Sequence, residues 1–258
     1  DGFRTSHEYQ KVACWDYADL ADMLDWDALN DFRRKSLNPE HPAQRGTAQN
    51  PDVFFQAKEA SNKAYDAIPE VVEEYMNKVN EKIGSDYKLF NYYGAEDADE
   101  VIIAMGSVCD TISETVDYLN ANGRKVGLVK VRLYRPFSVK HLVAAIPSTV
   151  KKISVLDRTK EPGSIGEPLY LDVVAALRDT EFANVPVYTG RYGLGSKDTT
   201  PAQIIAVFKN TEKKRFTIGI NDDVTNLSLA LDENPDTTPA GITSCKFWGL
   251  GADGTVGA

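Results

Sequence analysis

Strand-like and helix-like stretches alternate between residues 101 and 220, and this alternation limits the fold more than any other feature of the sequence. Each strand-like stretch is short and apolar, and each helix-like stretch has apolar residues at helical spacing. The predicted strands are 101–105, 126–131, 153–156, 185–188 and 216–220, and the predicted helices are 107–122, 138–146, 169–178 and 200–208. Short connections between them predict an α/β domain with a doubly wound, mostly parallel sheet.

The segment before this domain is mixed. Apolar residues between Tyr17 and Leu29 recur at helical spacing and predict one or two helices, whereas Pro39 and Pro42 indicate a loop. Pro69 is expected to start a helix that ends at Gly84. We therefore divide the chain at residues 1–63, 64–222 and 223–258, the last part being an acidic linker followed by a strand and a glycine turn.

Composition excludes several classes of function. The net charge of −9 argues against nucleic acid or an anionic membrane surface as a partner, because both need a basic face. The sequence has no apolar run of about 18 residues that could span a membrane. Cys14, Cys109 and Cys245 are far apart and form no CxxC pair, so we expect reduced thiols in a cytoplasmic protein and no metal site.

The loops that follow the predicted strands are rich in cations. The carboxyl ends of parallel strands meet at one edge of a sheet, where ligands and partners bind. The cations predicted at this edge are Arg132, Arg135, Arg158, Lys160, Arg191 and Lys197. They could form an anion site, or they could pair with the interleaved Asp157, Glu161, Glu167 and Asp198 in a polar interface. The interleaved acids favour the interface.

The last residues, FWGLGADGTVGA, are typical of the glycine turn that holds a phosphate between a strand and a helix. The predicted donors of this turn are Gly249, Gly251, Gly254 and Thr255. The helix is absent, and so is an acidic residue about 20 positions further on. We therefore expect the chain to be a piece of a longer protein.

Several long strings of residues resemble the single-chain pyruvate:ferredoxin (flavodoxin) oxidoreductases. They are residues 1–8 (DGFRTSHE), 37–42 (LNPEHP), 45–52 (RGTAQNPD), 130–137 (KVRLYRPF), 156–163 (LDRTKEPG), 191–197 (RYGLGSK) and the terminal 247–258. The resemblance implies the end of a first domain shared with thiamine diphosphate enzymes, a second domain like the C-terminal domain of transketolase, and the start of a third domain associated with coenzyme A.

The resemblance also implies a reaction for the parent protein. Pyruvate and coenzyme A would give acetyl-CoA and carbon dioxide, with electrons passing to ferredoxin or flavodoxin. Thiamine diphosphate, magnesium and iron–sulfur clusters would be the cofactors of a homodimeric parent. This chain would bind no cofactor alone, hold no catalytic residue and act as a scaffold. Gly249, Gly251, Gly254 and Thr255 would meet a coenzyme A phosphate, and Arg158, Lys160, Arg191 and Lys197 would hold an interdomain or intersubunit contact.

Two alternatives stay open at the level of sequence. The middle domain alone could be a non-catalytic interaction module. The chain could also be a nucleotide-binding dehydrogenase truncated at its glycine turn, which would bind NAD. A cytoplasmic location is expected, or a hydrogenosome-like organelle if the source is an anaerobic protist.

Overall fold

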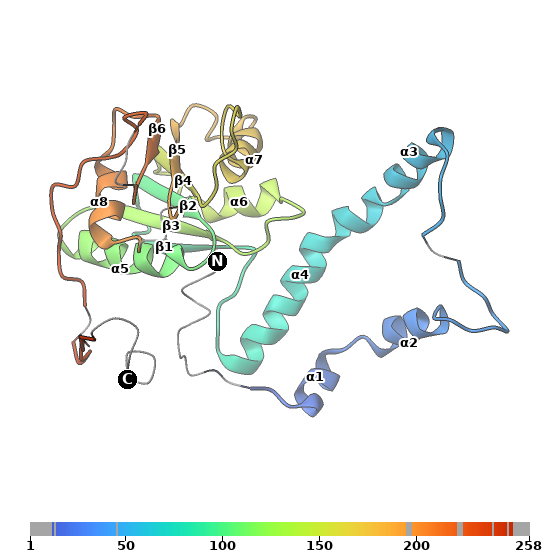
Figure 1. Ribbon diagram of the computed structural model, residues 1–258. Helices are drawn as coiled ribbons and strands as arrows, with labels where there is room; N and C mark the ends of the chain where they lie inside the picture. The colour runs from blue at the N-terminus through green and yellow to red at the C-terminus, as the bar shows by residue number, and fades with distance from the viewer. Residues whose placement is uncertain are drawn as a thin grey trace.

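The computed structural model describes residues 12, 14–44, 46–194, 198–220, 224–238, 240–246 and 248–249. An α/β unit follows a helical N-terminal segment (Figure 1). The elements are α1 (Tyr17–Met23), α2 (Trp26–Arg34), α3 (Pro51–Ala60), α4 (Asn62–Ile83), β1 (Phe90–Gly94), β2 (Glu100–Ala104), α5 (Val108–Ala121), β3 (Val126–Val131), α6 (Val139–Ala145), β4 (Lys152–Asp157), α7 (Pro168–Leu177), β5 (Val187–Arg191), α8 (Pro201–Lys209) and β6 (Arg215–Thr217).

The sheet has six strands in the order β1-β3-β2-β4-β5-β6. All neighbouring strands are parallel except β1, which pairs antiparallel with β3. The predicted α/β class and mostly parallel sheet are therefore confirmed. The strand β1 was not predicted, because its sequence FNYYG lacks the continuous apolar run of a buried parallel strand.

Helices cover both faces of the sheet. One core joins α5 and α8 to the sheet, and its largest fully buried side chains include Phe208 and Phe216. The other core joins α6 and α7 to the opposite face, and Val72 and Met76 of α4 pack against it. This two-sided burial explains why the strand sequences are apolar at successive positions rather than alternate ones.

Some predicted boundaries were wrong. Pro69 does not start a helix but lies buried inside α4, which begins at Asn62 and ends, as predicted, at a left-handed Gly84 with φ 69°. The helix α3, with Pro51 at its start, was not predicted. The strand β5 extends to Arg191 rather than ending at residue 188, because parallel pairing with β4 continues to Asp157. The proposed domain division stays a prediction.

The segment after β6 returns to the edge of the sheet. Thr217 accepts a hydrogen bond from the backbone of Leu229, donates one to Leu227, and forms an isolated parallel bridge with Ser228. Residues 240–246 and 248–249 form no strand, contrary to the predicted terminal strand. A strand needs a hydrogen-bonded neighbour, and no neighbour pairs with these described residues. The remainder of the predicted glycine turn lies outside the described residues.

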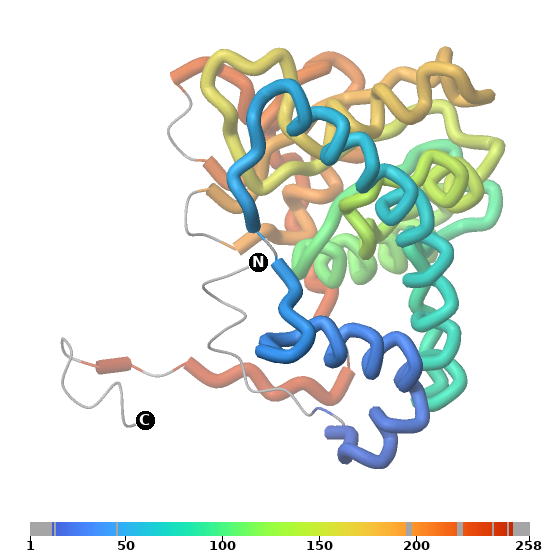
Figure 2. Tube along the Cα trace, turned by 90° about the vertical axis from the view of Figure 1, so that its right-hand side faces the viewer, coloured from blue at the N-terminus to red at the C-terminus, as the bar shows by residue number. Residues whose placement is uncertain are grey.

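The N-terminal helices extend beside the α/β unit. Figure 2 turns this segment toward the viewer and shows α4 beside the unit, and α1 lies near the C-terminal end of α4 in both views. Lys82 of α4 pairs with Asp19 of α1 at 2.8 Å, and Glu73 of α4 lies 3.6 Å from His141 of α6. Part of α4 thus connects the N-terminal helices to the sheet.

Candidate functional site

The carboxyl edge of the sheet contains a pocket at the point where the winding of the chain reverses. After β2 the chain continues into α5 on one face, whereas after the adjacent β4 it continues into α7 on the other face. Such a reversal opens a crevice between the two strand ends. The switch-point pocket, as we name it, has a volume of about 570 Å³. Its lining residues are Met105, Gly106, Tyr134, Leu156, Asp157, Arg158, Thr159, Pro168 and Tyr192.

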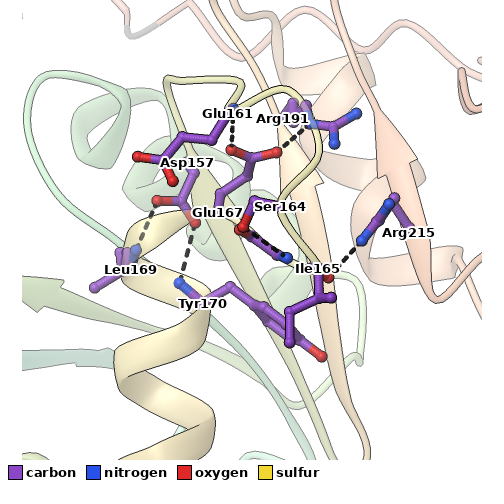
Figure 3. A network of polar contacts seen from close by, with 10 residues as sticks. Asp157, Glu161, Ser164, Ile165, Glu167, Leu169, Tyr170, Arg191 and Arg215 are labelled. Atoms are coloured by element: carbon purple, nitrogen blue, oxygen red, sulfur yellow. Dashed lines mark hydrogen bonds and ion pairs between the residues drawn. The ribbon is translucent and has the colours of Figure 1, made fainter.

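Asp157 ends β4 and is one of the residues that line this pocket, and it is only 3% exposed. Its two oxygens accept backbone hydrogen bonds from Leu169 at 2.9 Å and Tyr170 at 3.2 Å, as Figure 3 shows. Asp157 therefore caps the first turn of α7 from a distant position in the sequence. Burial raises the pKa of Asp157 to about 6, and the two backbone hydrogen bonds oppose this rise.

A buried ion pair fixes the loop between β4 and α7. Arg191 donates from Nε to Oε1 of Glu167 at 2.5 Å, and the other oxygen of Glu167 accepts the backbone N–H of Glu161 at 2.8 Å (Figure 3). Glu167 is 1% exposed and Arg191 is 8% exposed. Arg215 also holds this loop by donating to the carbonyl oxygen of Ile165. The long loop is thus ordered by contacts inside the domain.

The predicted cations differ in their surroundings. Arg191 is buried against Glu167, as the interleaved acids suggested, whereas Arg158 and Lys160 are exposed. Arg158 lines the switch-point pocket and donates from Nε to the carbonyl oxygen of Gly193 at 3.3 Å. Lys197 lies outside the described residues. The role of these four residues in an interdomain contact stays a prediction.

The other two cations of this edge bind within the domain. Arg132 donates to Oδ1 of Asn91 at 2.8 Å and stacks on Tyr87, and Arg135 pairs with Asp172 at 2.7 Å. Sequence reasoning missed the roles of Asp157 as a cap and of Tyr192 as a pocket wall. An acidic residue directly after the apolar run 153–156 was the available signal for a remote cap.

Of the four predicted donors of the phosphate turn, the structure describes only Gly249. Gly249 is exposed and lies in irregular backbone. Gly251, Gly254 and Thr255 lie outside the described residues. Their contact with a coenzyme A phosphate stays a prediction.

The described residues do not fit an iron–sulfur cluster or a bound magnesium ion. They contain no group of three or more His, Cys, Asp or Glu side chains placed to hold a metal. Cys14 and Cys245 are exposed, while Cys109 is buried in α5, where burial raises the pKa of its thiol to about 11. Within the same residues, no helix is long and apolar enough to cross a membrane.

A second candidate surface is the apolar side of the N-terminal helices. Large apolar side chains are exposed along α1 to α4, and such density on one segment indicates a contact with another body of protein. The exposed side chains are Tyr17, Leu20, Leu24, Trp26, Phe32, Leu37, Val53, Phe54, Phe55, Tyr65, Val71 and Ile83.

Comparison with known proteins finds two family models that match this chain and a solved structure with a weaker likeness to it. A family model described as pyruvate:ferredoxin oxidoreductase core domain II matches residues 98–204. A second, described as the thiamine diphosphate-binding domain of pyruvate flavodoxin/ferredoxin oxidoreductase, matches residues 1–77. A solved 2-oxoglutarate:ferredoxin oxidoreductase from Magnetococcus marinus is 22% identical with a TM-score of 0.38, covering 66% of this chain and 25% of that one.

Two curated relatives align along the whole chain. The pyruvate-flavodoxin oxidoreductase of Enterobacter agglomerans is 60% identical, and the pyruvate:ferredoxin oxidoreductase of Moorella thermoacetica is 56% identical. The chain spans 22% of the length of each. With both family models and these identities in agreement, the chain belongs to the pyruvate:ferredoxin (flavodoxin) oxidoreductase family.

Proposed function

We propose that this chain is the central scaffold of an enzyme that oxidises pyruvate with coenzyme A to acetyl-CoA and carbon dioxide. The observation that carries the proposal is 60% identity to a pyruvate-flavodoxin oxidoreductase over an alignment that covers the whole chain. The alignment covers the helical segment and the α/β unit alike, which supports the presence of both in the parent enzyme.

The parent enzyme would use thiamine diphosphate with magnesium and iron–sulfur clusters. The clusters would carry electrons singly to ferredoxin or flavodoxin. Because the described residues offer no ligand set for a metal ion or a cluster, we place the magnesium and the clusters elsewhere in the parent. The named acceptor differs between two relatives of similar identity, so this segment does not decide between ferredoxin and flavodoxin.

The scaffold role rests on the two surfaces described above. The apolar side of α1 to α4 belongs to the region matched by the thiamine diphosphate-binding family model, which supports its burial against the rest of that domain. At the carboxyl edge, Arg158 and Lys160 are exposed on a loop that buried contacts hold in place, which supports an interdomain or intersubunit contact there. We propose that Lys197 also takes part in this contact and that Arg191 supports it by ordering the loop.

We further propose that Gly249, Gly251, Gly254 and Thr255 begin a phosphate-binding turn for coenzyme A in a third domain. Support comes from the sequence, where closely spaced glycines follow an apolar stretch. We also propose that the parent enzyme is a homodimer in the cytoplasm.

The test is an assay of the full-length protein that contains this segment. Purified without oxygen, it should reduce methyl viologen only when pyruvate and coenzyme A are both present, and it should form acetyl-CoA. The 258-residue chain alone should show no such activity. Viologen reduction that needs no coenzyme A, or that uses NADH in place of pyruvate, would contradict the proposal.

A second candidate function concerns the chain by itself. The exposed apolar side of α1 to α4 favours an interaction module that binds other protein and no small molecule. Isothermal titration of the chain with its separately expressed flanking regions would show binding, with a negative heat-capacity change from apolar burial. No measurable binding would contradict it.

A further inference from the structure

The walls of the switch-point pocket come from parts of the chain that are distant in sequence. Met105 and Gly106 follow β2, Tyr134 follows β3, and Tyr192 follows β5. Residues 156–159 end β4 and lead toward α7. The volume of about 570 Å³ falls within the usual range for small-molecule sites. The fold therefore assembles a pocket of ligand size from four connections.

Hydrogen bonds inside the domain fix these walls. The hydroxyl of Tyr192 donates to the carbonyl oxygen of Met105 at 3.3 Å, which joins the ends of β5 and β2. Asp157 joins the end of β4 to the first turn of α7 through Leu169 and Tyr170. Because these contacts lie within the domain itself, they hold the walls in place, and binding would need little rearrangement.

Arg158 is placed at the pocket by a specific backbone arrangement. Its Nε donates to the carbonyl oxygen of Gly193, whose φ is +68°. A Cβ atom at residue 193 would lie 2.9 Å from that same Nε. Both the left-handed backbone and the close approach thus require glycine at 193, which leaves space for the stem of Arg158.

The electrostatics of the pocket favour an anion. Both carboxylate oxygens of Asp157 accept bonds from the N-terminus of α7, which compensates its negative charge. Among the described lining residues, Arg158 supplies the one positive charge, and Thr159 supplies a neighbouring hydroxyl. Met105, Leu156 and the tyrosines provide apolar surface around them.

We propose that the switch-point pocket binds a small organic anion, with a phosphate or carboxylate at Arg158 and a flat apolar ring against the tyrosine and methionine walls. The described lining of this site shares no residue with the glycine turn proposed for coenzyme A, and the proposal stands independently of the parent's reaction. Phosphate and carboxylate share the chemistry that a guanidinium recognises, so the test includes a probe of each kind.

The experiment is isothermal titration of the 258-residue chain with three probes. Adenosine monophosphate carries a ring and a phosphate, benzoate carries a ring and a carboxylate, and adenosine carries a ring alone. We compare the wild-type chain with Arg158→Gln, which removes the cation, and with Thr159→Phe, which fills the pocket and keeps the charge. Arg178→Gln is the matched control, because Arg178 is an exposed arginine beyond the end of α7 that does not line this pocket.

At least one of the two anions should bind the wild-type chain with a Kd below about 1 mM, and adenosine should bind about tenfold more weakly than adenosine monophosphate if the phosphate form is preferred. Arg158→Gln should weaken binding of the preferred anion about tenfold, Thr159→Phe should abolish it, and Arg178→Gln should leave it unchanged. Circular dichroism of each variant should match the wild type, which separates lost binding from lost folding.

Three results would overturn the proposal. The first is that neither anion binds the wild-type chain. The second is that Arg178→Gln weakens binding as much as Arg158→Gln does, which indicates general charge attraction. The third is binding that survives Thr159→Phe unchanged, which places the ligand outside the pocket.

Discussion

Arg191 and Glu167 form an ion pair that the loop between β4 and α7 shields from water. Replacement of Arg191 by Ala would leave the Glu167 carboxylate buried without its cation, because Glu167 is only 1% exposed. We expect the free energy of unfolding to fall by about 3–5 kcal/mol, measured by urea denaturation. The double variant Arg191→Met with Glu167→Gln should recover most of this loss, because it removes both charges.

The matched control is Arg135→Ala. Arg135 pairs with Asp172 at 2.7 Å, but its side chain is 57% exposed. Its loss should change the free energy of unfolding by about 1 kcal/mol or less. An equal loss for Arg135→Ala and Arg191→Ala would show that burial of the Glu167 pair has no special effect.

Asp157 gives a prediction about pH. Burial raises its pKa to about 6 from an ordinary value of 3.8, so the folded chain binds the proton more tightly than the unfolded chain. The contribution of Asp157 to the free energy of unfolding should therefore rise as pH falls from about 7 toward 4. The free energy of unfolding of the wild type and of Asp157→Asn can be measured by urea denaturation at several pH values. The wild type should gain stability relative to Asp157→Asn as the pH falls.

The opposite trend would carry a clear meaning. If the wild type loses stability relative to Asp157→Asn as pH falls, the hydrogen bonds from Leu169 and Tyr170 outweigh burial in setting the pKa of Asp157.

Part of this site could be predicted from the sequence. The rule that parallel strands end at one edge predicted Arg158 and Arg191 in loops after neighbouring strands. Arg158 directly follows β4, whereas Arg191 is the last residue of β5 itself. The partner of each charge could not be predicted in the same way. Pairing of Arg191 with Glu167, and not with Asp157, depends on the path of a long loop whose contacts are distant in sequence.

At the scale of elements, β5 packs against β6 without space for a side chain at Gly190. A Cβ atom at this position would lie 2.3 Å from the ring of Phe216 and 2.7 Å from Cδ2 of Leu156. Gly190→Ala should therefore lower the free energy of unfolding by about 1–3 kcal/mol, measured by urea denaturation.

A double-mutant cycle tests the cause of this loss. In a Phe216→Leu background, where the ring is absent, Gly190→Ala should be less damaging than in the wild type. Equal losses in both backgrounds would contradict the steric explanation and would place the effect in the backbone of β5.

The elements that the sequence predicted well are those with strong periodicity. The helix 107–122 matches α5 closely, because its apolar residues repeat on one face and pack into one core. The strand β1 and the first turns of α4 were missed for physical reasons. An edge strand needs no continuous apolar run, and tertiary packing keeps Pro69 within a helix despite its missing N–H.

At the scale of the whole molecule, the exposed apolar side of α1 to α4 should make the isolated chain self-associate. Tyr17, Phe32 and Phe55 are 91%, 65% and 68% exposed. Replacing all three by Ser should lower the average mass seen by sedimentation velocity at a given concentration, because less apolar surface is removed from water on association.

The control is a second triple variant, in which Ile165, Val139 and Val224 of the remaining chain become Ser. These residues are also exposed, at 82%, 44% and 83%. This variant should associate as the wild type does. A wild-type chain that stays monomeric at every concentration, or equal effects of the two triple variants, would contradict the prediction.

The path of the chain through the sheet has a mechanical consequence. The chain enters at β1 on one edge and leaves beyond β6 on the other, where residues 227–229 pair with Thr217. Six strands place these two edges about 24 Å apart, at the usual spacing of about 4.8 Å. A pull on the two ends would load the outer strands first and peel them away one hydrogen bond at a time. Within a larger enzyme, the sheet would therefore act as a spacer of fixed width, and its edges would yield before its centre.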